Sequence, residues 1–175
     1  MKQGFLTIFV CLYLFNGLIG QPTNNSCATA LQLTTQAEGC EIPLTGTTVG
    51  ATASGELPNP SCANFGSGLD VWYQVTVPQN GELYIELSQN IAGVNDYAFS
   101  VYTGVCGSLS EITCNDDNGL VLFPKVHLTN QTPGTTLYVR VWEFANDLAG
   151  RFSICAYQAY KVPENDLAAN AIHIP

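Results

Sequence analysis

The residues with the clearest chemical potential are four oxygen-bearing side chains around one predicted strand. Asp96 directly precedes the alternating stretch 97–102, and an acidic run follows shortly afterwards; the four residues are Asp96, Asn115, Asp116 and Asp117. Carboxylate and amide oxygens are ligands that Ca²⁺ prefers, and loops supply them together with backbone carbonyls. The group is therefore a candidate calcium site. The other interpretation is a polar turn whose side chains cap backbone amides, because the regular spacing of an EF-hand loop is missing.

The sequence gives little support for a catalytic centre. It contains no Gly-x-Ser-x-Gly motif, and His127 lies in a predicted strand between Val126 and Leu128 without an evident partner. Glu82 and Glu86 share one face of another predicted strand, where we expect them to be solvated; acid–base chemistry would require a cleft above them. We therefore expect a protein that is not itself an enzyme.

Five aromatic residues occupy the second faces of predicted strands. If they stood exposed in a row, sugar rings would stack on them or a protein would adhere to them. The candidate ligand-binding residues are Trp72, Tyr84, Tyr102, Tyr138 and Trp142. Core packing is the other interpretation, favoured for the two tryptophans, because a strand buried on both faces places aromatic side chains inside. Arg140 alternates with these residues and is expected to stack on them or to pair with an acid such as Glu143.

Short alternating strands would position these side chains. Val71, Tyr73, Val75 and Val77 share one face of the stretch 70–77, which is the period of two that a strand imposes. The same alternation recurs in the stretches 83–87, 97–102, 137–142 and 151–157. About eight such strands, with turns between them and no convincing helix, predict an all-β fold, an antiparallel β-sandwich or jelly-roll.

The cysteines predict a disulfide-bonded, exported domain. Six remain after the first twenty residues, and an even number in an exported chain implies disulfides. Cys106 and Cys114 stand eight positions apart, a separation that two neighbouring antiparallel strands would close, so we predict that they pair. The pairing of the other four stays open; these are Cys27, Cys40, Cys62 and Cys155. Zinc is disfavoured because the chain has no Cys-x-x-Cys pair.

The two ends of the chain differ from its body. Residues 1–20 have a short basic start, an apolar run and a small final residue, as in a secretory signal peptide, and the run is too short for a membrane anchor. Residues 21–160 would form the β-sandwich module. Residues 161–175 read as a linker and as the start of a second repeat, because 163–174 aligns without a gap with 22–33. Chance similarity within a polar linker is the other explanation.

The charge of the chain excludes two classes of partner. The formal net charge is −9 at pH 7, with 14 acidic residues against 5 basic ones. Nucleic acids and anionic membranes both require a basic surface, so we expect neither nucleic-acid binding nor membrane insertion after signal cleavage. A body of this length can bury one good core, which predicts a single domain.

These features together resemble the extracellular β-sandwich modules of large secreted bacterial proteins, especially those exported by the type IX system. The resemblance covers most of the mature chain and rests on segments that include Asn25–Ala30, Asp70–Tyr73, Val101–Leu109, Cys114–Asp117 and Gly150–Cys155. The chain is also similar to bacterial pre-peptidase C-terminal domains and, more loosely, to CUB domains. In the CUB resemblance, Asp96 matches an aspartate that binds calcium in many members.

The resemblance implies a location and a class of function. Such modules accompany proteases, glycosidases and adhesins without catalysing a reaction themselves. We therefore expect a secreted or cell-surface, non-catalytic module that serves adhesion or binds an extracellular polysaccharide or surface protein. The alternative is a structural spacer that accompanies an enzyme encoded further along the full-length chain. No cofactor is expected apart from the candidate Ca²⁺.

Overall fold

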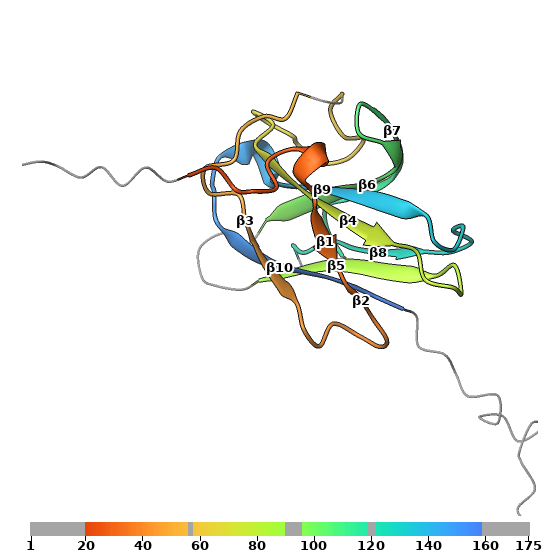
Figure 1. Ribbon diagram of the computed structural model, residues 1–175. Helices are drawn as coiled ribbons and strands as arrows, with labels where there is room; N and C mark the ends of the chain where they lie inside the picture. Colours follow the sequence, from red (N-terminus) through yellow and green to blue (C-terminus); the bar gives the residue numbers. More distant parts are fainter. Residues whose placement is uncertain (1–19, 56–57, 90–95, 119–121, 159–175) are drawn as a thin grey trace, which may run out of the picture.

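The domain is a two-layered β-sandwich (Figure 1). The computed structural model describes residues 20–55, 58–89, 96–118 and 122–158. The predicted signal peptide lies outside these ranges apart from Gly20, and the predicted second repeat lies wholly outside them. Both therefore stay predictions. Within the described ranges, no helix has the length and apolar character of a membrane span.

Each layer is one sheet, and we name the sheets by their central strands. The β4–β9 sheet has the order β1 (Leu31–Leu33), β4 (Asp70–Thr76), β9 (Thr136–Glu143), β6 (Tyr97–Val105) and β7 (Ser108–Asn115). The β5–β10 sheet has the order β2 (Thr35–Gln36), β10 (Arg151–Tyr157), β5 (Leu83–Gln89) and β8 (Lys125–Leu128), and β3 (Leu44–Thr47) also pairs with β10. Two short 3-10 turns, η1 (Cys27–Thr29) and η2 (Phe144–Asn146), complete the elements.

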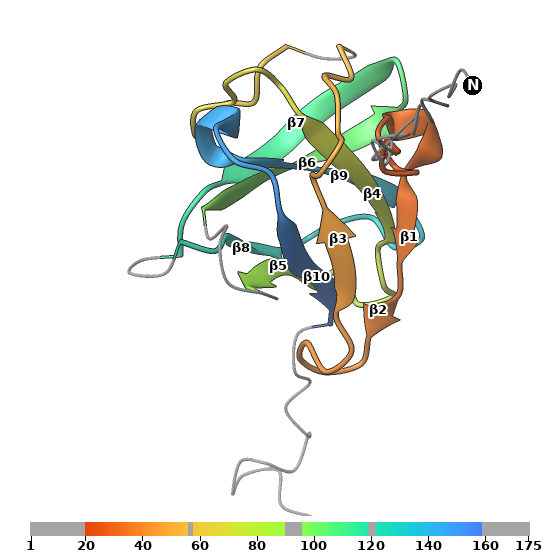
Figure 2. The same ribbon diagram turned by 90° about the vertical axis from the view of Figure 1, so that its left-hand side faces the viewer.

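The predicted all-β sandwich is confirmed, with two differences of detail. Ten strands form within the described residues instead of about eight. Most pairings are antiparallel, but β1 runs parallel to β4 and β2 runs parallel to β10. The reason is that the segment 31–36 crosses from one sheet to the other, so each of its short strands extends an edge that is already formed (Figure 2). The weak alternation in this segment gave no indication of the crossing.

The apolar residues that alternate along the strands form the core between the two sheets. One row from each of β4, β5, β6, β8, β9 and β10 faces inward and is buried, including Val71 and Tyr73 on β4, Leu83 and Ile85 on β5, and Phe152 on β10. Burial of one such large apolar side chain contributes about 1.5–3 kcal/mol relative to leaving it exposed. A one-residue slip of any strand would turn this row outward, so the core also determines the register.

The predicted Cys106–Cys114 disulfide is wrong. The disulfides are Cys27–Cys106, Cys40–Cys155 and Cys62–Cys114. Cys106 lies in the turn between β6 and β7, whereas Cys114 pairs with Ser100 near the far end of the same hairpin. At about 3.4 Å per residue the two positions are roughly 20 Å apart along the strands, so neighbouring strands do not bring them together. Each observed bond closes a long loop and would contribute about 4–5 kcal/mol on the chain-entropy model.

The two sheets differ in what covers their outer faces. The outer face of the β4–β9 sheet is packed beneath chain segments: Cys27 contacts Trp72 and Tyr102, and Phe65 contacts Trp142. Two of the three disulfides attach these segments to the β6–β7 hairpin. The outer face of the β5–β10 sheet carries partly exposed side chains along β5 and β8. The first sheet is therefore buried on both sides and the second mainly on one.

A buried ion pair lies beneath the covering segments of the β4–β9 sheet. Arg140 on β9 is 1% exposed, Asp70 on β4 is 0% exposed, and Arg140 Nε donates to Asp70 Oδ2 at 2.6 Å. Asp70 also accepts hydrogen bonds from the backbone N–H and the hydroxyl of Ser54 and from the indole N–H of Trp72. The remaining guanidinium nitrogens donate to Ser54 Oγ and to the carbonyl of Pro58, both at 3.3 Å. One charge pair thus attaches Ser54 and Pro58 to the sheet.

We predict that Arg140→Met lowers the free energy of unfolding by about 3–5 kcal/mol, because it leaves the Asp70 carboxylate buried without its partner. Urea denaturation followed by tryptophan fluorescence measures the change. Arg151→Met is the matched control, since Arg151 is exposed at the start of β10 and should change stability by less than about 0.5 kcal/mol. Equal effects of the two substitutions would show that the pair is energetically unimportant.

Candidate functional site

The acidic residues predicted as a calcium site do lie together. Carboxylate oxygens of Asp96, Asp116 and Asp117 are all within 4.8 Å of one another. They come from the residue before β6 and from the two residues after β7, which the β6–β7 pairing brings to the same end of the sheet. None of the three is paired with a basic side chain of the described chain. The cluster therefore carries uncompensated negative charge.

The electrostatics of this cluster are unfavourable for three ionised carboxylates. Partial burial, together with the charges of Asp117 and Asp96, raises the pKa of Asp116 to about 6. Partial burial and the charges of Asp117 and Asp147 also raise the pKa of Asp96. Glu143 lies near the same end, and its pKa is raised mainly by burial, although it accepts hydrogen bonds from the backbone N–H groups of Asp147 and Leu148. This end of the sandwich would gain from a bound cation.

The donor set fits a hard cation in its chemistry. All the candidate ligands are oxygens, and the Oδ1 atoms of Asn115 and Asp116 are buried without a hydrogen-bond partner within the described residues. Ca²⁺ takes six to eight oxygen ligands, so three carboxylates with a nearby amide would supply part of its shell and backbone or water oxygens the rest.

The predicted aromatic face does not exist as one surface. Trp72, Tyr102 and Trp142 are 0%, 3% and 0% exposed, and they pack beneath the segments that cover the β4–β9 sheet. Tyr138 is partly buried beside the same cluster, whereas Tyr84 lies on the other sheet. The five residues therefore belong to two different layers. Arg140 does stack on Trp72, at 5.3 Å from the ring centroid, but its ionic partner is Asp70 and not Glu143.

Tyr84 belongs instead to a stack of rings on the outer face of the β5–β10 sheet. The strand register places it between His127 on β8 and Tyr157 on β10, with ring centroids 4.1 and 5.2 Å away and nearly parallel planes. Because both ring faces of Tyr84 are occupied by neighbours, no sugar can stack on them. The stack stabilises the sheet through cross-strand contacts.

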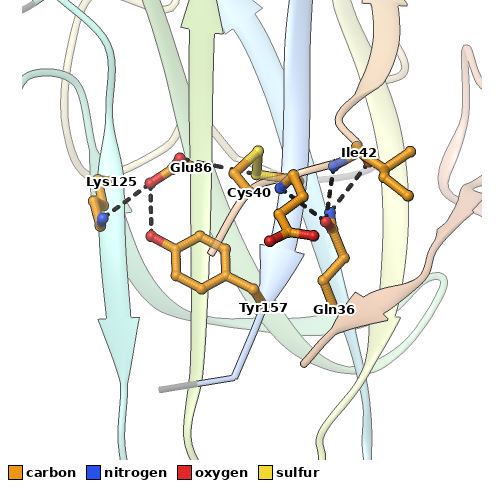
Figure 3. The surroundings of a disulfide bond; sticks show 8 residues. Gln36, Cys40, Ile42, Glu86, Lys125 and Tyr157 are labelled. Atoms are coloured by element: carbon orange, nitrogen blue, oxygen red, sulfur yellow. Dashed lines mark hydrogen bonds and ion pairs between the residues drawn. A yellow bond between two sulfur atoms is a disulfide. The ribbon is translucent and has the colours of Figure 1, made fainter. Parts of the chain in front are cut away.

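Glu86 of β5 and Glu82, which directly precedes β5, are both engaged within this outer face. Glu86 accepts the hydroxyl hydrogen bond of Tyr157 at 2.8 Å and pairs with Lys125 at 2.9 Å (Figure 3). Glu82 lies 3.7 Å from His127 Nε2. Both carboxylates thus contact a basic side chain of β8, and Glu86 also contacts Tyr157 of β10. The contacts are those of cross-strand pairs between adjacent strands.

A recess, which we call the Glu111 recess, opens where a covering loop meets the β6–β7 hairpin. Its volume is about 180 Å³, and its lining residues are Pro58, Asn59, Ser61, Tyr102, Leu109 and Glu111. Glu111 Oε2 accepts hydrogen bonds from the Ser61 backbone N–H at 3.2 Å and from the Tyr102 hydroxyl at 3.4 Å. One wall is thus hydrogen-bonding and another is apolar, which is the composition of a ligand pocket.

Both walls of the Glu111 recess are held in place by covalent and buried contacts. The Cys62–Cys114 disulfide joins the loop, next to Ser61, to β7. Arg140 holds the Pro58 carbonyl from beneath. Asn59 also lines a second recess of about 210 Å³, together with Phe65 and Arg140. Asn59 therefore borders two hollows.

Sequence reasoning did not identify Glu111. It stands in the Ser- and Thr-rich stretch of β7 without a motif around it. The available signal was its position three residues before Cys114, which becomes informative only when the partner of that cysteine is known to be Cys62. The correct disulfide pairing would have placed Glu111 beside the loop 58–61.

Comparisons with known proteins identify a family for most of the chain. A family model described as galactose binding domain-like, associated with the type IX secretion system, matches residues 23–154. No curated protein matches the sequence significantly. The pre-peptidase C-terminal domain of a Bacillus anthracis collagenase aligns with a TM-score of 0.41 and 10% identity, covering 71% of this chain and 95% of that one. The Yersinia pseudotuberculosis-derived mitogen aligns with a TM-score of 0.39 and 16% identity, covering 71% and 94%.

We predict that the metal-free domain becomes less stable as the pH rises from about 4 to about 6. The pKa of Asp116 in the folded state lies above its usual unfolded-state value of about 3.9. The folded state therefore binds the proton more tightly, which stabilises it at low pH, and this stabilisation is lost as Asp116 ionises. Melting temperatures recorded in EDTA across this range measure the effect. Asp116→Asn should flatten the decline, whereas Glu38→Gln, at an exposed position in another loop, should not. An unchanged pH profile in Asp116→Asn would contradict the prediction.

Proposed function

The chain belongs to the galactose-binding-domain-like family associated with type IX secretion, and from this premise we propose that it is a non-catalytic, extracellular recognition module. Secretion agrees with this family and with the three disulfides, which form in oxidising compartments. The module would act by adhesion, binding a polysaccharide or a surface protein on behalf of a larger secreted or cell-surface protein. A glycan is the ligand class that we favour.

The observation that supports glycan binding is the Glu111 recess. The carboxylate of Glu111 is oriented by two hydrogen bonds to Oε2, and it can accept hydrogen bonds from a pair of sugar hydroxyls. The amide of Asn59 would both donate and accept, and Pro58 and Leu109 would contact the C–H groups of a sugar ring. Because the walls are already held in place, little conformational entropy is lost on binding.

The charge of the chain favours an uncharged sugar over an acidic one. The formal net charge is −9, and the recess itself carries the carboxylate of Glu111. A uronic acid or a sulfated sugar would be repelled at this position. We therefore propose a neutral hexose unit of an extracellular polysaccharide as the ligand.

A spacer that holds a neighbouring domain is the second candidate. It is favoured by one observation: the described chain begins and ends at opposite ends of the sandwich (Figure 2). Such an arrangement suits a module inserted in line between others. A spacer needs no ligand, so the two candidates differ in whether the isolated domain binds a glycan at all.

We predict that the mature chain binds neutral glycans on an array and that Glu111→Gln weakens binding about tenfold to a hundredfold. The loss corresponds to a hydrogen bond to a charged group, about 1.5–3 kcal/mol. Isothermal titration with the best array ligand measures the dissociation constant. Glu82→Gln is the matched control, because Glu82 directly precedes β5 on the other sheet and lies outside the recess.

The outcomes separate the site from the function. If the protein binds a glycan and Glu111→Gln binds equally well, the function stands and the recess is not its site. If the folded mature chain binds no glycan on the array, recognition of polysaccharide is wrong and the spacer is favoured.

We further propose that Asp96, Asp116 and Asp117, with Asn115 beside them, bind Ca²⁺. The mutual proximity of three unpaired carboxylates supports this, as do the two buried oxygens without partners. The ion would connect the start of β6 to the end of β7 and neutralise the acidic end of the sandwich. Its role would be to stabilise the domain.

We predict that Ca²⁺ raises the melting temperature over that in EDTA and that Asp96→Ala abolishes the difference. At a hundredfold excess over the dissociation constant, the stabilisation would be about 2.7 kcal/mol. Differential scanning calorimetry at pH 7.5 and pH 5 measures it, and the effect should be smaller at pH 5 because Asp116 is then partly protonated. A melting temperature that is the same in Ca²⁺ and EDTA would remove the site.

A further inference from the structure

The strongest unexplained feature of the surface is Ile42. Its side chain is 81% exposed, which is more than any other large apolar residue of the described chain. Leu31 and Leu44 nearby are each 39% exposed. Single exposed apolar residues are common and need no explanation, so the surroundings decide whether Ile42 matters.

The main chain around Ile42 is held rigidly. The side chain of Gln36 accepts hydrogen bonds from the backbone N–H groups of Glu41 and Ile42, both at 2.9 Å, and donates to the Ile42 carbonyl at 3.1 Å (Figure 3). Two positions earlier, the Cys40–Cys155 disulfide joins the same loop to β10. One glutamine and one disulfide therefore hold the isoleucine side chain in solvent.

An apolar recess lies beside the exposed isoleucine. Its volume is about 350 Å³, the largest of the three recesses described for this protein, and its apolar walls include Leu33, Ile42, Leu44 and Ile154. It lies where the edge of β10 changes partners, from β3 at residues 151–154 to β2 at residues 156–157. The interruption leaves a hollow at the edge of the sheet, and the projecting Ile42 borders it.

The charge around this surface indicates what would bind there. Glu38 and Glu41 are exposed in the same loop, and neither forms an ion pair with a basic residue of the described chain. The only nearby lysine that is described, Lys125, is paired with Glu86 on the outer face of the sheet (Figure 3). An apolar hollow, beside a loop that carries two exposed carboxylates without basic partners, complements a partner that is aliphatic at one point and basic beside it.

We propose that Ile42 and the adjoining recess bind a protein segment that presents an aliphatic side chain flanked by lysine or arginine. The aliphatic side chain enters the recess and packs against Ile42 and Leu44, while the basic residue pairs with Glu38 or Glu41. This surface lies at the edge of the β5–β10 sheet, apart from the Glu111 recess on the β4–β9 sheet. It does not depend on glycan binding, and it would connect the module to a second protein.

A random peptide library displayed on phage tests the proposal without knowledge of the natural partner. The mature chain is the bait, and phage that bind the Ile42→Ser variant are removed first. We expect the selected peptides to share an aliphatic residue next to lysine or arginine. Fluorescence polarisation should then show at least tenfold weaker binding to Ile42→Ser, and weaker, less salt-dependent binding to the double variant Glu38→Gln, Glu41→Gln.

Val105→Ser is the matched control, because Val105 is also aliphatic and 66% exposed but lies at the β6–β7 turn. It should bind the selected peptides as the wild type does. Melting temperatures of all variants should agree, since each change is at the surface.

Three results would overturn the proposal. The first is a selection that yields no peptide dependent on Ile42. The second is a set of selected peptides without basic residues. The third is a dimer of the mature chain, seen by sedimentation equilibrium and abolished by Ile42→Ser, which would make the surface a contact between two copies.

Discussion

The ion pair between Arg140 and Asp70 is the interaction on which the outer half of this domain depends. A charge buried to this extent is tolerated only when it is paired and hydrogen-bonded, and the partners of Asp70 come from the adjacent strand, from the covering loop and, for Trp72, from its own strand. Ser54 and Pro58 are drawn to the sheet because they satisfy the guanidinium and the carboxylate. The loop that forms one wall of the Glu111 recess is thus positioned by a requirement for charge compensation.

The disulfides likewise attach to the sheets those chain segments that do not contribute to the core between them. Hydrophobic burial between the sheets specifies the strands, but it exerts no force on a loop that crosses an outer face. Cys62–Cys114 and Cys27–Cys106 attach the two covering segments to opposite ends of the β6–β7 hairpin. Cys40–Cys155 does the same for the Ile42 loop on the other sheet. The Glu111 recess and the acidic cluster after β7 lie next to Cys62–Cys114, and Ile42 lies next to Cys40–Cys155.

The sequence was sufficient to predict the strands that form the core and insufficient to predict what covers the outer faces of the sheets, and both results have the same physical reason. Alternation reports that a strand has two faces, and the rows headed by Val71 and Leu83, each recognised as one face, form part of the interior. It does not report what covers the second face, so a binding platform stayed open for Trp72 and Trp142 beside the favoured interpretation of core packing, which their burial confirms. The disulfide error has a related origin. Proximity in sequence suggested Cys106–Cys114, but a hairpin separates residues at its tip from residues at its base. The acidic cluster was found because sequence neighbours of paired strands do converge at a strand end.

A sandwich core of this kind carries no information about function, since the same inward rows occur in folds with unrelated roles. The residues that distinguish this chain break the rules of the core: a buried arginine, a carboxylate that faces a hollow, and an isoleucine held in solvent. Each costs stability where it stands, because it desolvates a charge or exposes apolar surface. Two of them border recesses on different sheets, Glu111 beneath one loop and Ile42 beside another. Two separate surfaces, one with a carboxylate in its wall and one beside an exposed isoleucine, suit a module that joins a ligand to a partner more than one that only maintains a distance.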